Sequence, residues 1–485
     1  MGQKTAHSHF IGIGGIGMSA IAQVLLARGE CVSGSDLVAS PVTQRLQALG
    51  ARVSIGHDAG AAEGADRVVV SDAIRPDNPE LARAREQGIA VVRRSQVLGE
   101  IMSLSPRGRD GGPGEAGAQP RGGRGIAVAG THGKTTTSGM IALMLERAGL
   151  DPTALLGGDL PAFGGNARVG GGDLIVAEAC EAYNSFLDLD PEIAVITNVE
   201  ADHLDVHGTL RALQARFREF LGRIRPGGRA VLNADDALLS GWARELGDGA
   251  VTFGVESQAD YAAREIEAEG LAVAFEAVER GRALGRVRVG APGRHNAANA
   301  ICAIAAAMEA GAPFSAAEAL AEFHGMKRRF EVVAETGGIT VVDDYAHHPT
   351  EIRATLATAR PLCGGRLIAV FQPHLFSRTQ LLLDGFARAF DDADRVIVTE
   401  IYPAREDPIP GVTGELLARR LREAAPGKEV DFIAPKHRIA EALAPHLRPG
   451  DWVLTLGAGP VDSVAEDLSQ QLSQSGAEGG HCVRH

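Results

Sequence analysis

Apolar residues along this chain follow two alternating patterns. Short continuous apolar runs, such as the one within 9–15, are typical of buried strands. The segments between them, such as 18–29, place apolar residues at the spacing of an amphipathic helix. This alternation predicts βαβ units and parallel sheets. The expected strands are 9–15, 30–36, 66–73 and 90–94, then 125–130, 173–179, 192–199 and 229–236, and finally 339–345, 366–372, 394–401 and 451–459.

Two stretches interrupt the alternation. Segment 105–124 is rich in Gly, Pro and Arg and has no periodicity, so it is expected to be a linker or surface insert without a core or a site. Residues 474–485 are small and polar and are expected to form a frayed tail. The remaining 1–104, 125–325 and 326–473 are each expected to form one α/β domain, in line with roughly 100–200 residues per domain.

Composition narrows the class of protein. Apolar residues fill 45% of the 485 positions and aromatic residues only 4%, which predicts sizeable, mainly aliphatic cores. The formal net charge of −13 disfavours nonspecific nucleic-acid binding, which requires a basic surface. The five cysteines show no paired spacing, and the chain has neither a signal-like start nor a long apolar run. These features predict a soluble, cytoplasmic protein with reduced thiols and no membrane or nucleic-acid partner.

The first motif with a chemical meaning is Gly12-x-Gly14-x-x-Gly17, between an expected strand and an expected helix. Glycines let the backbone approach a diphosphate, and the helix N-terminus favours its negative charge. Asp36, at the end of the next strand, is placed to bond a ribose hydroxyl. The motif alone indicates a phosphate-bearing ligand without saying which, and glycines serving only tight packing remain an alternative.

A second glycine loop runs from Gly130 to Thr137, again between a strand and an apolar helix. Successive N–H groups in such a loop bind phosphate oxygens, Lys134 reaches the outer phosphates, and a threonine hydroxyl joins a magnesium shell. The loop is a variant, because Val128 stands where the usual phosphate loop has its first glycine. Two such loops in one chain predict two phosphorylated ligands.

Acids and a histidine follow the next strands of the same expected sheet: Glu178, Glu181, Asn198, Asp202, His203 and Asp205. In parallel sheets, ligands bind beyond the carboxyl ends of the strands. Oxygen-rich side chains at that edge suit Mg²⁺, which usually keeps waters and substrate phosphates in its shell.

Together with further motifs, the second loop resembles the Mur ligase family and, more distantly, the folylpolyglutamate synthases. The other resembling segments are GIGGIGMSAIA (12–22), VSGSD (32–36), EACE (178–181), SFL (185–187), TNVEADHLD (197–205), GRHNAANA (293–300), RRFEVV (328–333), VDDYAHHPTE (342–351), FQPHLFSRT (371–379) and PIPGV (408–412). They occur in the family's order and span nearly the whole chain.

The resemblance implies a Rossmann-like N-terminal domain, a central P-loop-type ATPase domain with a mostly parallel sheet, and a Rossmann-like C-terminal domain. It also implies an ATP- and Mg²⁺-dependent amide ligase, a monomer or homodimer, that joins L-alanine to the lactoyl carboxylate of UDP-N-acetylmuramate through an acyl phosphate.

The resemblance implies a role for each matching residue. The UDP-sugar would contact Gly14, Gly15, Gly17, Asp36, Ser71 and Tyr345. ATP would contact Gly130, Thr131, His132, Gly133, Lys134, Thr135, Thr136, Asn296, Asn299, Arg329 and Asp344. Mg²⁺ would be held by Thr135, Glu178 and His203. The implied catalytic residues are Lys134, His203, Arg329, His347, His374 and Arg378.

Three alternatives stay open at this point. Another Mur-type ligase would attach a different amino acid or a recycled peptide to the same nucleotide sugar. A dehydrogenase using Gly12–Gly17 leaves the second loop unexplained, and a nonenzymatic nucleotide-binding regulator leaves the magnesium and phosphate residues without a role. The base that deprotonates the amine is not identified, with His347 and His374 as candidates.

The chain departs from the family pattern in three places. The insert 105–124 is additional, and the acidic motif has Cys180 where many relatives have aspartate. Several relatives also hold a second Mg²⁺ through a carbamylated lysine, but no lysine occurs between Thr135 and Met326. Arg216 and Arg218 stand in that region, and a guanidinium stays protonated and cannot add carbon dioxide.

Overall fold

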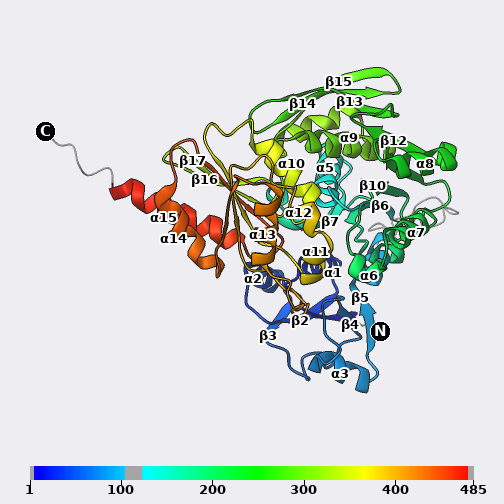
Figure 1. Cartoon of the computed structure of the whole chain (residues 1–485). Coiled ribbons are helices and arrows are strands. Elements are labelled where there is room, and N and C mark those ends of the chain that lie inside the picture. The colour runs from blue at the N-terminus through cyan, green and yellow to red at the C-terminus, as the bar shows by residue number, and fades with distance from the viewer. Residues whose placement is uncertain (1–4, 104–122, 479–485) are drawn as a thin grey trace. The chain divides into compact units, whose positions relative to one another are not determined.

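A computed structural model describes residues 5–103 and 123–478 and contains three sheets (Figure 1). The five- and ten-stranded sheets belong to one compact unit, and the six-stranded sheet belongs to a second. The second unit also includes the short stretches 267–273 and 290–296. The expected α/β class with three mostly parallel sheets is confirmed. Nearly all of segment 105–124 lies outside the described residues, so its expected role stays a prediction.

The first sheet has the order β3-β2-β1-β4-β5, and every neighbouring pair is parallel. Its strands are β1 (His7–Ile11), β2 (Cys31–Asp36), β3 (Arg52–Ile55), β4 (Arg67–Val70) and β5 (Ala90–Arg93). Its helices are α1 (Ile16–Ala27), α2 (Pro41–Ala48), α3 (Pro79–Glu86) and α4 (Arg94–Ser103). Helix α1 buries the apolar residues that predicted it, among them Ile21, Val24 and Leu25.

The second sheet has the order β15-β14-β13-β12-β11-β10-β6-β9-β7-β8. Its strands are β6 (Arg124–Ala129), β7 (Thr153–Leu160), β8 (Gly165–Arg168), β9 (Leu174–Glu178), β10 (Ile193–Ile196), β11 (Arg229–Asn233), β12 (Ala250–Gly254), β13 (Tyr261–Ala268), β14 (Val273–Glu279) and β15 (Arg282–Val289). The helices in this part of the chain are α5 (Lys134–Arg147), α6 (Leu204–His207), α7 (Leu210–Leu221), α8 (Ala237–Leu246) and α9 (Arg294–Glu309), with 3₁₀ turns including η3 (Ala182–Asp188) and η5 (Phe314–Glu322). In the order of the sheet, every neighbouring pair from β12 to β7 is parallel. The edge strand β8 is antiparallel to β7.

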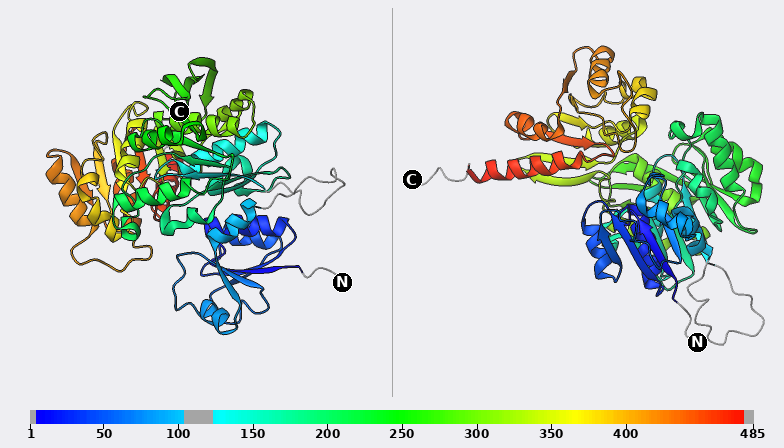
Figure 2. Two further views of the ribbon diagram at one scale, coloured as in Figure 1. Left: turned by 90° about the vertical axis from the view of Figure 1, so that its right-hand side faces the viewer. Right: turned by 90° about the horizontal axis from the view of Figure 1, so that it is seen from below.

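The third sheet has the order β16-β17-β21-β18-β19-β20 and is parallel except for β16. Its strands are β16 (Glu331–Thr336), β17 (Ile339–Asp344), β18 (Leu367–Phe371), β19 (Arg395–Val398), β20 (Glu429–Phe432) and β21 (Trp452–Leu456). Its helices are α10 (Pro349–Ala359), α11 (Phe376–Leu381), α12 (Leu383–Phe386), α13 (Gly414–Ala424), α14 (Ile439–Leu443) and α15 (Asp462–Glu478). Helix α15, red in Figure 2, packs along β16 and β17 and continues into the segment expected to be a frayed tail.

Within residues 5–103 and 123–478, no helix is both long and apolar enough to span a membrane.

A buried ionic network ties the first sheet to helix α3. His9 Nε2 lies 2.7 Å from Glu80 Oε2, and His57 Nδ1 lies 2.8 Å from Glu80 Oε1. The Glu80 side chain is fully buried. Burial disfavours its ionised form, but hydrogen bonds from His9, Ser35 and His57 outweigh burial and hold the pKa of Glu80 below its usual value.

Replacing this carboxylate, as in Glu80→Gln, is expected to lower the free energy of unfolding by about 2 kcal/mol at pH 7, because the buried His9 and the half-buried His57 lose a charged partner. The folded-state pKa is depressed, so the stabilisation is present above the ordinary pKa of 4.5 and is lost as pH falls through the folded-state value. Urea unfolding at pH 7 and at pH 3 measures this. The exposed Glu86→Gln, on the same helix, is the matched control. Equal stability of the two variants at pH 7 would contradict the prediction.

Candidate active site

The loop Gly12–Gly17 turns the chain from β1 into α1. The N–H groups of Gly12 and Ile13 both donate to the Ser35 carbonyl, at 2.8 and 2.9 Å. The N–H of Gly14 donates to Asp36 Oδ2 at 2.8 Å. The strand–loop–helix context expected for a phosphate loop is therefore present. One Asp36 oxygen holds the loop itself, a role that the sequence did not predict.

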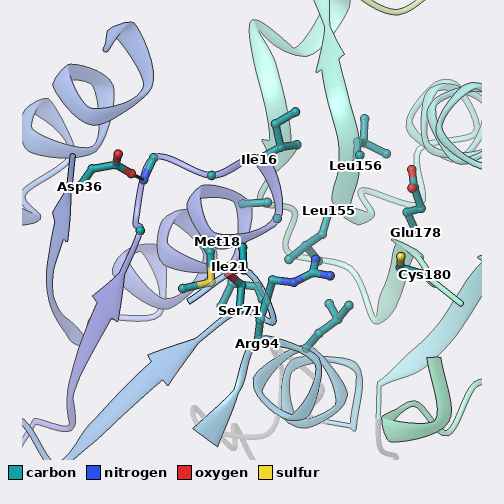
Figure 3. Close-up of a pocket in the computed structure, with 18 of the residues that line it drawn as sticks. Ile16, Met18, Ile21, Asp36, Ser71, Arg94, Leu155, Leu156, Glu178 and Cys180 are labelled. Carbon is teal, nitrogen blue, oxygen red and sulfur yellow. Dashed lines mark hydrogen bonds between the residues drawn. The ribbon is translucent and has the colours of Figure 1, made fainter. Parts of the chain in front are cut away.

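A cavity of about 670 Å³ opens beside this loop (Figure 3). Five of the residues expected to contact the UDP-sugar line it: Gly14, Gly15, Gly17, Asp36 and Ser71. Its apolar walls include Met18 and Ile21 of α1 and Leu155 and Leu156 of β7, and Glu178 also reaches it. Cavities of a few hundred cubic ångströms hold ligands of nucleotide size. Tyr345, the sixth expected residue, belongs to the second unit.

Two further residues line the cavity that sequence reasoning did not assign, Arg94 and Cys180. Burial and the nearby Glu181 carboxylate raise the pKa of the Cys180 thiol to about 11, so the thiol is neutral at pH 7. Cysteine in place of aspartate therefore removes a negative charge from this wall. Arg94 stands in the ordinary-looking run RRSQ, and no local pattern marks it as a site residue.

The second loop lies between β6 and α5 and depends on two glycines. Gly130 has a φ of +134°, and a Cβ there would lie 2.0 Å from Thr197 Oγ1. Gly133, with a φ of +79°, precedes α5 without a side-chain cap, and a Cβ there would lie 2.5 Å from Asn299 Oδ1. Gly133 has no side chain that could cap the first N–H groups of α5, and a helix N-terminus that keeps these groups available is the arrangement that binds phosphate.

The segment after β10 holds this loop in shape. The N–H of Thr131 donates to the Asn198 carbonyl at 3.0 Å, and the N–H of His132 donates to Asn198 Oδ1 at 2.8 Å. Thr197 Oγ1 donates to the His132 carbonyl at 2.5 Å, and the N–H of Glu200 donates to Thr131 Oγ1 at 2.9 Å. The segment that resembles the family at 197–205 thus holds the loop Gly130–Thr137 in place.

Lys134 lies folded over the loop. Its ammonium donates to the carbonyls of Gly130 and Thr131, at 2.5 and 3.1 Å, and to Glu181 Oε1 at 3.0 Å. Burial disfavours the charged amine, but the carboxylates of Glu181 and Glu178 outweigh burial and raise the pKa of Lys134. Lys134 therefore carries a fixed positive charge at the mouth of the loop.

Thr135 and Glu178, the residues expected to hold Mg²⁺, are neighbours. Thr135 Oγ1 donates to Glu178 Oε2 at 2.5 Å. Gly157 leaves room for this carboxylate, because a Cβ there would lie 2.1 Å from Glu178 Oε2. A hydroxyl and a carboxylate beside a phosphate loop are hard oxygen donors, so the pair fits Mg²⁺.

His203 lies near the same carboxylates from the start of α6. Its Nε2 is 3.8 Å from Glu181 Oε1 and 3.7 Å from Asp202 Oδ2. Within the described part of the chain, His203 Nδ1 and Glu181 Oε2 are buried without a hydrogen-bond partner. Orphaned buried polar atoms call for a ligand, water or ion, and this donor set fits a second cation.

Three of the expected ATP residues are held in different ways. Asn299 Oδ1 accepts a hydrogen bond from Thr137 Oγ1 at 3.4 Å, which places Asn299 against the loop Gly130–Thr137. Thr136 is buried in the first turn of α5. Asn296 belongs to the second unit, where its amide donates to the Pro292 carbonyl at 2.7 Å.

In the second unit, Asp344 ends strand β17. Its two carboxylate oxygens accept hydrogen bonds from the N–H groups of Ala346 and Phe330, at 2.7 and 2.9 Å. Burial raises the pKa of Asp344 to about 6, against the opposing effect of Arg329. Arg329 Nη1 in turn lies 3.7 Å from Glu351 Oε1.

The other expected residues of this unit form one aromatic and basic cluster. The guanidinium of Arg329 lies 5.2 Å from the ring centroid of Tyr345, and the Tyr345 and His347 rings meet edge to face. The His347 and His374 ring centroids are 5.8 Å apart. The buried Arg378 donates from Nη1 to His374 Nδ1 at 2.8 Å. The structure therefore brings these five residues together.

Family models for Mur ligases match three successive parts of the chain. The model of the Mur ligase family catalytic domain matches 7–105, that of the Mur ligase middle domain matches 128–307, and that of the Mur ligase glutamate ligase domain matches 328–459.

Similar proteins cover nearly the full length. A UDP-N-acetylmuramate–L-alanine ligase of Symbiobacterium thermophilum is 49% identical over 97% of this chain and 95% of its own, and one of an Anaeromyxobacter species is 46% identical over 96% and 97%. The crystal structure of a UDP-N-acetylmuramate–alanine ligase from Thermotoga maritima matches with a TM-score of 0.80 and 30% identity, covering 97% of this chain and 99% of that one. A murein peptide ligase from Psychrobacter arcticus matches with a TM-score of 0.69 and 26% identity, covering 99% and 100%. The chain belongs to the Mur ligase family.

Proposed function

We propose that this chain joins L-alanine to the lactoyl carboxylate of UDP-N-acetylmuramate at the expense of ATP, giving UDP-N-acetylmuramoyl-L-alanine, ADP and phosphate for peptidoglycan synthesis. The observation that carries the proposal is the 49% identity, over 97% of the chain, to a ligase named for these two substrates. The cavity beside Gly12–Gly17 and the clamped loop with Lys134 support it, since they offer one site for a nucleoside diphosphate and one for ATP. Because both nucleotides are cytoplasmic metabolites, we infer that the enzyme acts in the cytoplasm.

The first proposed step activates the carboxylate, whose oxygen is otherwise a poor leaving group. A lactoyl oxygen attacks the γ-phosphorus, the bond from that phosphorus to the β–γ bridging oxygen breaks, and ADP leaves. Lys134 and the loop N–H groups neutralise charge on the phosphoryl oxygens. Because Lys134 already rests on the Gly130 and Thr131 carbonyls, its charge is positioned before ATP binds. Arg329 is proposed as a second cation, and Asn296, Asn299 and Asp344 as contacts of the adenosine.

Bound Mg²⁺ would supply further positive charge to the phosphate oxygens. Thr135 and Glu178 are proposed to hold one ion, and His203 with neighbouring carboxylates a second. The hydrogen bond between Thr135 and Glu178 holds the two oxygen donors side by side, so this pair is positioned for a cation.

In the second step the amine of L-alanine attacks the acyl carbon, phosphate leaves, and the nitrogen loses a proton. The two histidine candidates for the base differ. A guanidinium only donates, so His374 Nδ1 must accept from Arg378, which leaves the other nitrogen, Nε2, to carry the proton. His347 Nδ1 faces the Tyr345 carbonyl at 2.9 Å and Glu351 Oε2 at 3.3 Å, so it carries the proton and leaves Nε2 as the acceptor. We therefore propose His347 as the base.

A ligase for a recycled peptide is the second candidate, since the chain also resembles a murein peptide ligase at 26% identity. Phosphate release from ATP, with Mg²⁺ and UDP-N-acetylmuramate, distinguishes the two. We expect release only when UDP-N-acetylmuramate and an amino acid are both present. L-alanine should be preferred over other amino acids and over a peptide. Equal release with the peptide would overturn the proposed amino-acid specificity.

The missing lysine leads to a prediction about the second cation. Since no lysine lies between Thr135 and Met326, turnover is expected to be insensitive to removing or adding bicarbonate. His203→Ala should lower the rate and raise the Mg²⁺ concentration needed for half-maximal rate, because the orphaned imidazole is a proposed ligand. The exposed His437→Ala serves as the control. Strong activation by bicarbonate, or an unchanged Mg²⁺ requirement in the His203 variant, would contradict this placement.

A further inference from the structure

Arg94 places a cation in the wall of the cavity. It is the first residue of α4, and Figure 3 shows its side chain extending into the cavity beside Leu155. It crosses the first turn of α1 at Gly17, where a Cβ would lie 2.1 Å from Arg94 Nη1. Within residues 5–103 and 123–478, no carboxylate forms an ion pair with Arg94. A guanidinium in a cavity, left without a counter-ion, calls for an anionic ligand.

One carboxylate, that of Asp188, binds the two residues on either side of Arg94. Arg93 Nη2 donates to Asp188 Oδ1 at 2.8 Å, and Ser95 Oγ donates to Asp188 Oδ2 at 2.5 Å. Asp188 ends η3, and its backbone also lies against α4, because a Cβ at Gly99 would be 2.3 Å from the Asp188 carbonyl oxygen. Asp188 therefore fixes the start of α4 from both sides of Arg94.

Arg93 and Arg94 differ in how their charges are balanced. Asp188 neutralises Arg93, which is about half exposed, and leaves the charge of Arg94 for the cavity. The anion that fits must also reach the glycine loop and the N-terminus of α1, which line the same cavity. A diphosphate has enough oxygens to bind both a planar guanidinium and a row of N–H groups.

We propose that Arg94 binds the diphosphate of the nucleotide sugar and that Asp188 is the positioning residue that holds Arg94 in place through Arg93 and Ser95. This inference rests on the proposed function, because that function puts a uridine diphosphate in this cavity. The proposal also assigns a role to η3. This turn follows directly after Glu181, the partner of Lys134, and ends at Asp188. Its seven residues, Ala182–Asp188, therefore connect the two proposed nucleotide sites.

The test is calorimetric titration of the full chain with UDP and, separately, with uridine. Arg94→Gln is expected to weaken UDP binding about 10-fold or more and to leave uridine binding unchanged, because only the phosphate contact is lost. Arg94→Lys should recover part of the affinity, since it restores the charge without the planar fork. Asp188→Asn should weaken UDP binding by a smaller factor. Asp190→Asn, which breaks a nearby exposed pair with Arg223, is the matched control and should bind as wild type does.

The double variant Arg94→Gln with Asp188→Asn separates positioning from general damage. If Asp188 acts through Arg94, adding Asp188→Asn to Arg94→Gln has no further effect on UDP affinity. Additive losses, or an unchanged dissociation constant in Arg94→Gln, would overturn the assignment. A wild-type chain that binds no UDP would instead overturn the proposed function, and this inference with it.

Discussion

Lys134→Ala is expected to reduce kcat on the order of 10³-fold, as when other groups that stabilise transition-state charge are removed. The ammonium of Lys134 donates to the Gly130 and Thr131 carbonyls, which places a cation directly on this loop. Its pKa is raised, so the side chain stays charged throughout any neutral assay range. Single-turnover phosphate release measures the loss.

Removing Lys134 also leaves the buried Glu181 carboxylate without its cation, which is expected to lower the stability of the fold as well as the rate. The double variant with Glu181→Gln should recover melting temperature without recovering turnover, and so separates the two effects. Arg147→Ala, at the exposed end of the same helix, is the control and should retain normal turnover. A Lys134→Ala enzyme within a few-fold of wild type would place the reacting phosphate elsewhere.

Glu178→Gln is the second change with a large expected effect, about 10²-fold in kcat at fixed Mg²⁺. Glutamine retains a partner for Thr135 Oγ1 and the shape of the site, but it removes the negative charge that a hard cation requires. Raising the Mg²⁺ concentration should recover part of the rate, which a purely structural defect would not allow.

A Mg²⁺ titration of initial rates at saturating ATP measures this effect. Glu219→Gln, an exposed acid on α7, is the matched control and should leave the titration unchanged. If Glu178→Gln shifts only the KM for L-alanine, Glu178 is not a metal ligand.

Most of the strands that the sequence predicted are largely buried, although β5, predicted at 90–94, is an edge strand with exposed and half-buried positions. The runs in β4, β9, β10 and β18 are continuous in apolar residues, and each of these strands lies between two neighbours in its sheet. Strands such as β3, which is mostly exposed, and β20, which is only partly buried, carry no such run and were not predicted. The extension β13–β15 was not predicted either, because charged residues interrupt its apolar runs.

The candidate site shows the same division. Residues in local motifs, such as Gly14, Lys134 and Glu178, could be proposed from the sequence because a loop or a strand end indicates their chemistry. Arg94 and Asp188 were missed because their connection joins positions far apart in the chain, and no spacing rule relates such positions. The hold of Asp36 on the Gly14 N–H is likewise visible only once β1 and β2 are paired.

The strand order of the second, ten-stranded sheet also matters while the chain is being synthesised. β6, which leads into the nucleotide loop, pairs on one side with β9 and on the other with β10, both made later. Thr197 and Asn198, which hold this loop, follow β10. At about 5–20 residues per second, ribosomes deliver them several seconds after the loop. A nascent chain that stops before Asn198 therefore lacks the residues that hold this loop, and we expect ATP to stabilise only chains that have passed this point.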